Sequence, residues 1–346
     1  MKIVVASAGH AAPHAGWAAI DELADLLVHY LGATLVTPRR AAPGWAQRLM
    51  GAQAGGWQPL DCAGGDVLIV VAHAPQDLSM IDAIANCRGK FGRIVGWVTD
   101  SYFAAGFGRA LAQYDAITVT AREDMAHPPA RHGLAVHHVY QGIDGLAWAP
   151  PVDGARSIDL IGFGRMPPSY HAHFAARFHP ASSPHLYLHS PLGNVTGPTV
   201  HLERGMLFKL LHRSRISLAF NLFVEPQGQR PRSMMVTSRW LESLLAGCVV
   251  AGKRPVSRMA DDMLCWDGAT VELADDPQDA GEQLHQLLAQ GDQLQGQRRR
   301  NVGEVLRRHD WRHRIVDLCR HFQLDVPPAL RADQQRVLAL ADRFAW

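Results

Sequence analysis

Short, almost uninterrupted apolar runs alternate with amphipathic segments in the first part of the chain. The run Asp66–Ala72 reads DVLIVVA, and two further runs occupy 93–99 and 116–120. Strands of a parallel sheet are covered by helices on both faces and therefore carry few polar residues. A first strand is expected at 2–6, followed by an amphipathic helix over 17–31. This alternation predicts an α/β chain with a mostly parallel, doubly wound sheet.

A change to Pro, Gly and Asp at 150–155 predicts a domain boundary. Beyond it the alternation resumes, with strands expected near 157–161, 185–189, 215–220, 247–251 and 269–273. Helices are expected at 282–288, 298–322 and 329–344. The length of 346 residues allows two domains with a core each. We predict an N-terminal domain over 1–150, a C-terminal domain over 151–326 and a terminal helical segment over 327–346.

The composition describes a globular protein, because 47% of the residues are hydrophobic and 19% are charged. The formal net charge of +2 provides no overall attraction to nucleic acid, so no nucleic-acid partner is expected. The five cysteines are odd in number and form no C-x-x-C pair, which argues against a disulfide framework or a structural zinc site.

A cytoplasmic location is expected from three features. The scattered cysteines fit a reducing compartment, and the first residues read as a strand rather than as a signal peptide. No apolar run approaches the roughly 18 residues that a membrane-spanning helix requires. Peripheral contact with the inner face of the membrane is compatible with all three.

The stretch Met234–Pro255 reads as a loop, a short helix, a glycine stop at Gly247 and a buried strand. Leu241 and Leu244 belong to an apolar helical face. The opposite face, expected to be solvated, carries a hydroxyl, a cation and a carboxylate from Ser238, Arg239 and Glu242. Such groups at a helix N-terminus suit a ligand with phosphates and sugar hydroxyls. An ordinary α/β unit with a charged surface is the alternative.

This stretch resembles the donor-binding helix of GT-B nucleotide-sugar glycosyltransferases, in particular the group 1 glycosyl transferases and their spore-maturation-like branch. Four further segments match the same pattern in order, namely Asp115–Asp124, Tyr140–Pro150, Ile158–Arg165 and Arg307–Arg314. The resemblance implies the GT-B fold, in which two Rossmann-like doubly wound domains face a cleft. It also implies that a C-terminal helix returns to the N-terminal domain.

The implied activity is transfer of a sugar from a nucleotide diphosphate-sugar to a hydroxyl acceptor in the inter-domain cleft. The C-terminal domain would hold the donor, and the N-terminal domain would contact a saccharide, glycolipid or other hydroxyl acceptor. By analogy with the family, polysaccharide or glycolipid biosynthesis is expected. No D-x-D motif occurs in a suitable loop, so we expect metal-independent transfer with no cofactor besides the donor.

The resemblance also implies roles for individual residues. The carboxylate at the position of Glu242 accepts hydrogen bonds from the donor ribose, so Glu242→Ala is expected to weaken nucleotide binding and leave the fold intact. Thr237 and Ser238 would hold the diphosphate. After the turn at Gly164, Arg165 would offset the charge on the leaving diphosphate. Further cations available for the diphosphate are Arg230, Arg232 and Arg239.

Two departures from the family pattern leave the donor sugar and the stereochemical outcome open. Many retaining members carry two glutamates separated by seven residues, and the partner position here is Met234. The lysine usual after the Gly-Arg turn is missing, and Met166–His171 stands in its place. A catalytically inactive module that binds nucleotide sugars therefore stays open as an alternative.

Polar residues end two buried strands of the N-terminal domain. His73 and Asp100 should lie at the carboxyl edge of the sheet, where either could be a general base or could position the donor sugar. The alternative for each is a strand-end polar residue bonded to a nearby loop. Diphosphate or acceptor contacts are expected from the loop after the first strand, through Gly9, His10 and His14.

An NAD(P)-dependent oxidoreductase is the rival enzyme class, suggested by Gly162–Arg165 after a strand. The third glycine of that fingerprint is Pro167, and no acidic residue follows at the expected distance. Nineteen histidines raise the question of a metal site, but they lack the i, i+4 pairs or cysteine partners of a zinc site. No metal site is predicted.

Overall fold

The computed structural model describes the chain except for residues 43–55, 131, 191–194, 222–223, 225–232 and 346. The chain forms two compact units. The first comprises Met1–Gln141 and Ile315–Leu330, and the second comprises Gly142–Arg314 and Arg331–Trp346. The chain thus leaves the first unit, rejoins it at residue 315 and leaves it again after residue 330.

The first unit contains a six-stranded sheet in the order β2-β1-β3-β4-β5-β6, and all neighbouring strands are parallel. The strands are β1 Ile3–Ser7, β2 Thr34–Val36, β3 Gly65–Ala72, β4 Phe91–Val98, β5 Ala116–Val119 and β6 Ala135–His138. The described residues up to 141 include the α-helices α1 Ala18–Leu31 and α3 Cys87–Lys90. They also include the short 3-10 helices η1 Gly9–Ala11, η2 Ala15–Trp17, η3 Pro75–Ala83, η4 Ala104–Gly106, η5 Arg109–Gln113 and η6 Arg122–Ala126.

The apolar runs of the sequence form the central strands of this sheet. Every residue of β3 from Val67 to Ala72 is buried, as expected for a strand covered on both faces. Helix α1 packs on β1 through its buried stripe and ends at Gly32, which adopts the left-handed conformation with φ of 60°.

The second unit contains a five-stranded parallel sheet in the order β11-β10-β9-β7-β8. Its strands are β7 Ile158–Phe163, β8 Tyr187–Ser190, β9 Ser214–Phe220, β10 Val249–Lys253 and β11 Val271–Glu272. The helices from residue 145 onward are α4 Gly145–Trp148, α5 Pro168–Phe178, α6 Val200–Leu211, α7 Ser238–Leu245, α8 Arg258–Met263, α9 Pro277–Leu288, α10 Asp292–His309, α11 Trp311–His321 and α12 Pro328–Asp342.

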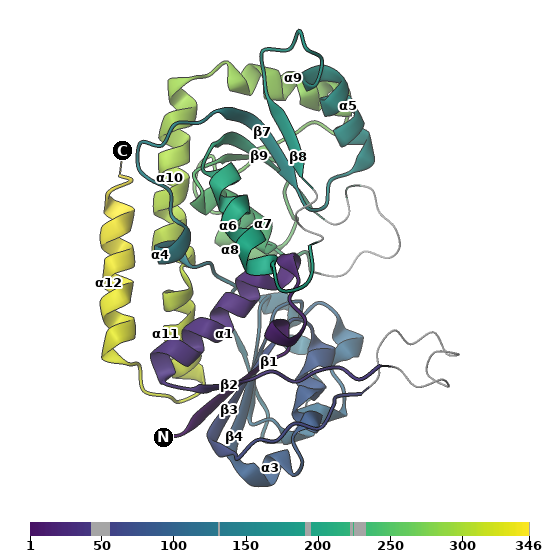
Figure 1. Cartoon of the computed structure of the whole chain (residues 1–346), viewed down its shortest axis with the longest axis vertical. Helices are drawn as coiled ribbons and strands as arrows, with labels where there is room; N and C mark the ends of the chain where they lie inside the picture. The colour runs from purple at the N-terminus through teal and green to yellow at the C-terminus, as the bar shows by residue number, and fades with distance from the viewer. Residues whose placement is uncertain (43–55, 131, 191–194, 222–223, 225–232, 346) are drawn as a thin grey trace. The chain divides into compact units, whose positions relative to one another are not determined.

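Helices cover both faces of the second sheet. Phe174 of α5 and Leu284 of α9 share one core with Leu160 and Ile216 of the strands. Helix α7 lies on the other face, where Ser243 and Ser217 of β9 are hydrogen bonded at 2.8 Å. Figure 1 shows α5 beside α9, and α12 beside α10. Two parallel sheets covered by helices confirm the predicted α/β fold of two Rossmann-like units.

Both sheets have the same strand order when each unit is numbered separately, 2-1-3-4-5, with β6 as a sixth strand in the first unit. The order reverses between β1 and β3 in the first unit and between β7 and β9 in the second. Ligands of open α/β sheets bind outside the carboxyl ends of the strands at this reversal. Each unit therefore has one preferred position for a ligand.

The segment that rejoins the first unit differs from the expected helix over 327–346. It is the stretch 315–330, in which Arg93 donates hydrogen bonds to the carbonyl oxygens of Phe322 and Gln323 at 2.8 and 3.2 Å. The residues after 330 belong to the second unit, where Arg307 pairs with Asp342 at 3.0 Å. The helix expected over 298–322 is two helices, because Asp310 interrupts it and accepts a hydrogen bond from the backbone N–H of Arg312.

A buried ionic cluster joins residues 142–145 to the start of α11. The Arg312 guanidinium lies 2.8 Å from Asp144 and 3.1 Å from Asp310, and Arg312 and Asp310 are 4% and 0% exposed. Asp310 also accepts a hydrogen bond from the backbone of Gly145, while Ile143 forms a parallel bridge with Asp310. The cluster thus links two of the segments that carry the resemblance, 140–150 and 307–314.

Among the described residues, each helix is too short or too polar to span a lipid bilayer.

We predict that Arg312→Ala lowers the free energy of unfolding by about 3–5 kcal/mol, because it leaves the buried Asp310 carboxylate without its cation. Arg320→Ala is the control, since Arg320 is 69% exposed and pairs with Asp317, and its loss should cost less than about 1 kcal/mol. Chemical denaturation measures both values. Equal losses in the two variants would contradict the structural role of the cluster.

Candidate functional site

The turn after β7 lies at the strand-order reversal of the second sheet. Gly164 adopts φ of 63°, in the left-handed region that favours glycine. A Cβ atom at this position would lie 2.6 Å from Nη2 of Arg239, so a larger residue would also displace that side chain. Arg165 follows and is exposed. The turn therefore presents a cation at the carboxyl end of β7.

The N-terminus of α7 meets this turn. Arg239, in the first turn of α7, donates a hydrogen bond to the carbonyl oxygen of Arg165 and lies 5.6 Å above the ring of Phe163. Thr237 is the N-cap residue, and Ser238 is the first helical residue. The Thr237 side chain makes no capping bond, so the first N–H groups of α7 are available to a ligand in the described structure. Gly164, Arg165, Thr237, Ser238 and Arg239 are thus brought together.

Electrostatics at this position favour an anion. Burial and, to a lesser extent, the neighbouring charge of Arg165 lower the pKa of Arg239 to about 10, while Glu242 opposes the shift. Arg239 stays protonated at neutral pH, because that pKa is well above 7. Two guanidinium groups and the positive end of a helix dipole attract a negatively charged group.

The expected exposure of Glu242 is wrong. Glu242 is 5% exposed, and its carboxylate lies 2.6 Å from the guanidinium of Arg204 on α6, which is also 5% exposed. The Arg204 guanidinium lies 5.5 Å above the ring of Trp148 and 5.2 Å from that of Phe208. Helix α6 therefore supplies a partner to the face of α7 that the sequence leaves polar. Glu242 belongs to a buried ion pair, and the expectation of an intact fold in Glu242→Ala is corrected.

His73 lies at the corresponding reversal of the first sheet, immediately after β3. Its Nε2 atom is 3.1 Å from the carboxylate of Asp21, and its ring stacks on Trp17 at 4.6 Å. Asp21 is 1% exposed, and a Cβ atom at position 9 would lie 1.7 Å from its carboxylate oxygen, which explains Gly9. Asp21 and Trp17 therefore fix the orientation of the His73 ring.

Sequence reasoning missed Asp21 as part of this site. The available signal was a carboxylate within the apolar stripe of the predicted helix 17–31. Because its partner lies 52 positions away, spacing alone does not reveal the pair. Asp100 lies beside His73, since its backbone N–H donates to the His73 carbonyl oxygen at 2.9 Å.

The remaining loop histidines make local bonds. His10 pairs with Asp25 at 2.8 Å, and that hydrogen bond raises the pKa of His10. His14 accepts a hydrogen bond from the backbone of Gly16 and thereby caps η2. Arg230 and Arg232 lie outside the described residues. Within the described ranges, no group of three or more His, Cys, Asp or Glu side chains is arranged to hold a metal ion.

A pocket of about 450 Å³ opens in the first unit near the ends of β3 and β4. Its wall includes Trp57, Gln76 and Arg40, whose guanidinium lies 4.0 Å above the Trp57 ring and 2.8 Å from Asp77. An aromatic face beside hydrogen-bonding groups suits a polar ring such as a sugar.

A family comparison matches a large part of the second unit. Residues 178–320 match the family described as "Glycosyl transferase-like". This part of the chain is similar to that family. The matched residues include all of α7, with Thr237, Ser238, Arg239 and Glu242. They do not reach the Gly164 turn or the strands of the first unit.

A comparison with solved structures finds three similar proteins, TarM, AviGT4 and GtfA. TarM shares 8% identity with a TM-score of 0.47, over 74% of this chain and 54% of TarM. AviGT4, a glycosyltransferase involved in avilamycin A biosynthesis, shares 16% sequence identity with a TM-score of 0.49. The match covers 93% of this chain and 98% of AviGT4. The pneumococcal O-GlcNAc transferase GtfA shares 11% sequence identity with a TM-score of 0.45. The match covers 79% of this chain and 57% of GtfA.

The chain spans about half the length of TarM. No curated protein sequence matches the chain.

We predict that Glu242→Ala lowers the free energy of unfolding by about 3–5 kcal/mol, because the variant breaks the buried ion pair between Glu242 and Arg204. Glu282→Ala is the matched control, since Glu282 is 52% exposed and pairs with Arg177 at the surface. Its loss should cost less than about 1 kcal/mol. Thermal and chemical denaturation test this, and full stability of Glu242→Ala would exclude a structural ion pair.

Proposed function

We propose that the protein transfers a sugar from a nucleotide diphosphate-sugar to a hydroxyl acceptor, and that the second unit binds the donor. One observation carries the proposal: the Gly164 turn, Arg165 and Arg239 meet the N-terminus of α7, which lies in the glycosyl transferase-like segment. This is the carboxyl end of the sheet at its order reversal, where α/β proteins bind nucleotides.

The diphosphate is proposed to lie between the Gly164 turn and the first turn of α7. Backbone N–H groups near Ser238 bind phosphate oxygens, and the absence of a side chain at Gly164 leaves room for close approach. When the bond from the sugar to the diphosphate breaks, negative charge develops on the leaving group. Arg165 and Arg239 stabilise that charge, so we propose metal-independent transfer.

The first unit is proposed to provide the acceptor side. The pocket beside Trp57 receives the acceptor, and His73 is the proton acceptor or donor-positioning group. With Nε2–H donated to Asp21, the lone pair of His73 is on Nδ1, which has no hydrogen-bond partner among the described residues. In an inverting reaction Nδ1 removes the acceptor proton, and in a retaining reaction the ring positions the sugar. Asp100 is the second candidate, and the inter-domain location of the reaction stays a prediction.

Calorimetric titration with nucleoside diphosphates, nucleotide sugars and NAD(P), without added metal, tests the donor site. Arg165→Gln should weaken nucleoside diphosphate binding about tenfold or more, the effect of losing one charge-assisted hydrogen bond of about 1.5–3 kcal/mol. Arg165 is exposed, so the variant should fold normally. Arg336→Gln, which removes an exposed guanidinium on α12, should bind like the parent. Binding of NAD(P) alone, or unchanged diphosphate affinity in Arg165→Gln, would sink the assignment.

Turnover of the nucleotide sugar, with water as the acceptor where no other is known, tests His73. If His73 is the general base, His73→Gln should reduce turnover about 10²-fold to 10⁴-fold while nucleoside diphosphate affinity stays within about twofold. His132→Gln is the control, since His132 is exposed. Turnover by the parent protein together with normal turnover by His73→Gln would remove His73 from the reaction.

A further inference from the structure

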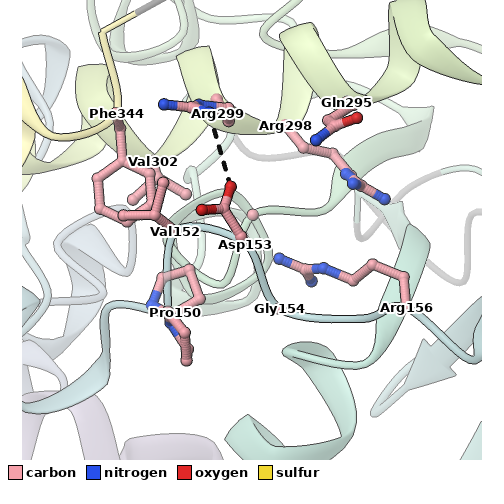
Figure 2. Close-up of a pocket in the computed structure, with 12 residues that line it drawn as sticks. Pro150, Val152, Asp153, Gly154, Arg156, Gln295, Arg298, Arg299, Val302 and Phe344 are labelled. Carbon is pink, nitrogen blue, oxygen red and sulfur yellow. Dashed lines mark ion pairs between the residues drawn. The ribbon is translucent and has the colours of Figure 1, made fainter.

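A second cationic pocket lies at the opposite edge of the second sheet (Figure 2). Arg156 precedes β7 and Gly247 precedes β10, so the pocket is at the amino ends of the strands. The Gly164 turn follows the carboxyl end of β7, which separates the two positions by the length of the strand. The pocket holds about 80 Å³, and one water requires about 10–15 Å³, so there is room for a small polyatomic ion.

One face of α10 forms the wall of this pocket. Gln295, Arg298, Arg299 and Val302 are spaced by three and four residues and therefore share a helical face. Figure 2 shows Gln295 and Arg298 side by side on this face and Arg156 extending from the segment that precedes β7. The lining thus brings guanidinium groups from two distant parts of the chain to one cavity.

The cations of the pocket exceed its anions. Three guanidinium groups face one carboxylate, Asp153, which is 80% exposed and lies 3.7 Å from Arg299. Arg298 forms no hydrogen bond or ion pair with the described residues. The carboxylate of Asp159 is not a counter-ion for Arg298, because it pairs at 3.0 Å with Arg215, another cation near Arg298. Cys248 is not a counter-ion either, since burial raises the pKa of its thiol to about 11.

Arg156 is held rigidly at the pocket. Its Nη1 atom donates to the carbonyl oxygens of Leu211 and Ser214 at 2.9 and 3.0 Å, and Nη2 donates to that of Ala246 at 2.9 Å. Its Nε–H is buried and has no partner among the described residues. Burial, together with the nearby charge of Arg156, lowers the pKa of Arg298 to about 10. An anion between the two guanidinium groups would relieve this repulsion between positive charges.

We propose that the pocket between Arg156 and Arg298 binds a phosphate-class anion, either inorganic phosphate or a small phosphate monoester. Guanidinium groups match the planar pairs of phosphate oxygens through paired N–H donors. The Arg156 and Arg298 guanidinium groups carry two positive charges, and a phosphate group carries about −1.5 to −2 near neutral pH. The bound ion joins α10 to the segment before β7 and thereby stabilises the second unit, independently of the proposed donor site.

Thermal melting in sodium phosphate, compared with sodium chloride at equal ionic strength, tests this site in the full chain. Phosphate should raise the melting temperature in a saturable manner. Arg298→Gln should weaken phosphate binding about tenfold or more, as measured by titration of the shift. Arg300→Gln is the matched control, because Arg300 lies two positions along α10 and is exposed. It should respond to phosphate like the parent protein.

Two further variants keep the outcome decisive. The rise in melting temperature with phosphate should persist in Arg165→Gln, which alters the proposed donor site. Loss of this rise in Arg165→Gln but not in Arg298→Gln would overturn the assignment of the anion to the Arg156–Arg298 pocket. Arg298→Lys retains the charge and removes the paired donors, so phosphate should bind several-fold more weakly than in the parent. No shift beyond that of chloride in the parent, or an undiminished shift in both Arg298 variants, would overturn the proposal. Glycerol phosphate then distinguishes inorganic phosphate from a phosphate monoester as the ligand. A rise in melting temperature equal to that with inorganic phosphate supports a monoester.

Discussion

The Arg312 guanidinium holds together two regions on which the arrangement of the chain depends. It binds Asp144, just after the chain leaves the first unit, and Asp310, just before the chain rejoins it. Both carboxylates also cap a helix: Asp144 begins α4 and Asp310 begins α11. One buried cation therefore sets the direction of two helices, and a charge buried in this way is tolerated only while its partners stay in place.

The two sheets present opposite charges at equivalent positions. In each unit a glycine follows the first strand and leaves space for a charged side chain from a helix. At Gly9 that side chain is the carboxylate of Asp21, and at Gly164 it is the guanidinium of Arg239. A diphosphate would be repelled by the first and attracted by the second. The shared topology provides two ligand positions, and the sign of one side chain in each favours donor binding in the second unit.

Much of the fold could be predicted from the sequence, because continuous apolar runs such as 66–72 leave few alternatives to a buried strand. The Gly164 turn and the start of α7 followed from local spacing. The burial of Glu242 could not be predicted, because helical periodicity does not say that α6 places Arg204 against the polar face. The Asp21–His73 pair and the Arg156–Arg298 pocket were missed for the same reason. Each joins residues that only the tertiary fold brings together.

The passage of residues 315–330 through the first unit has a consequence for biosynthesis. Ribosomes release the N-terminal residues first, and domains generally begin to fold as they emerge. Here the stretch that covers Arg93 and carries the buried Leu318 and Phe322 is made only after nearly the whole second unit. The surface of the first unit that residues 315–330 cover therefore stays exposed until translation is almost finished. Completion of the first unit is thus among the last events in the synthesis of this protein.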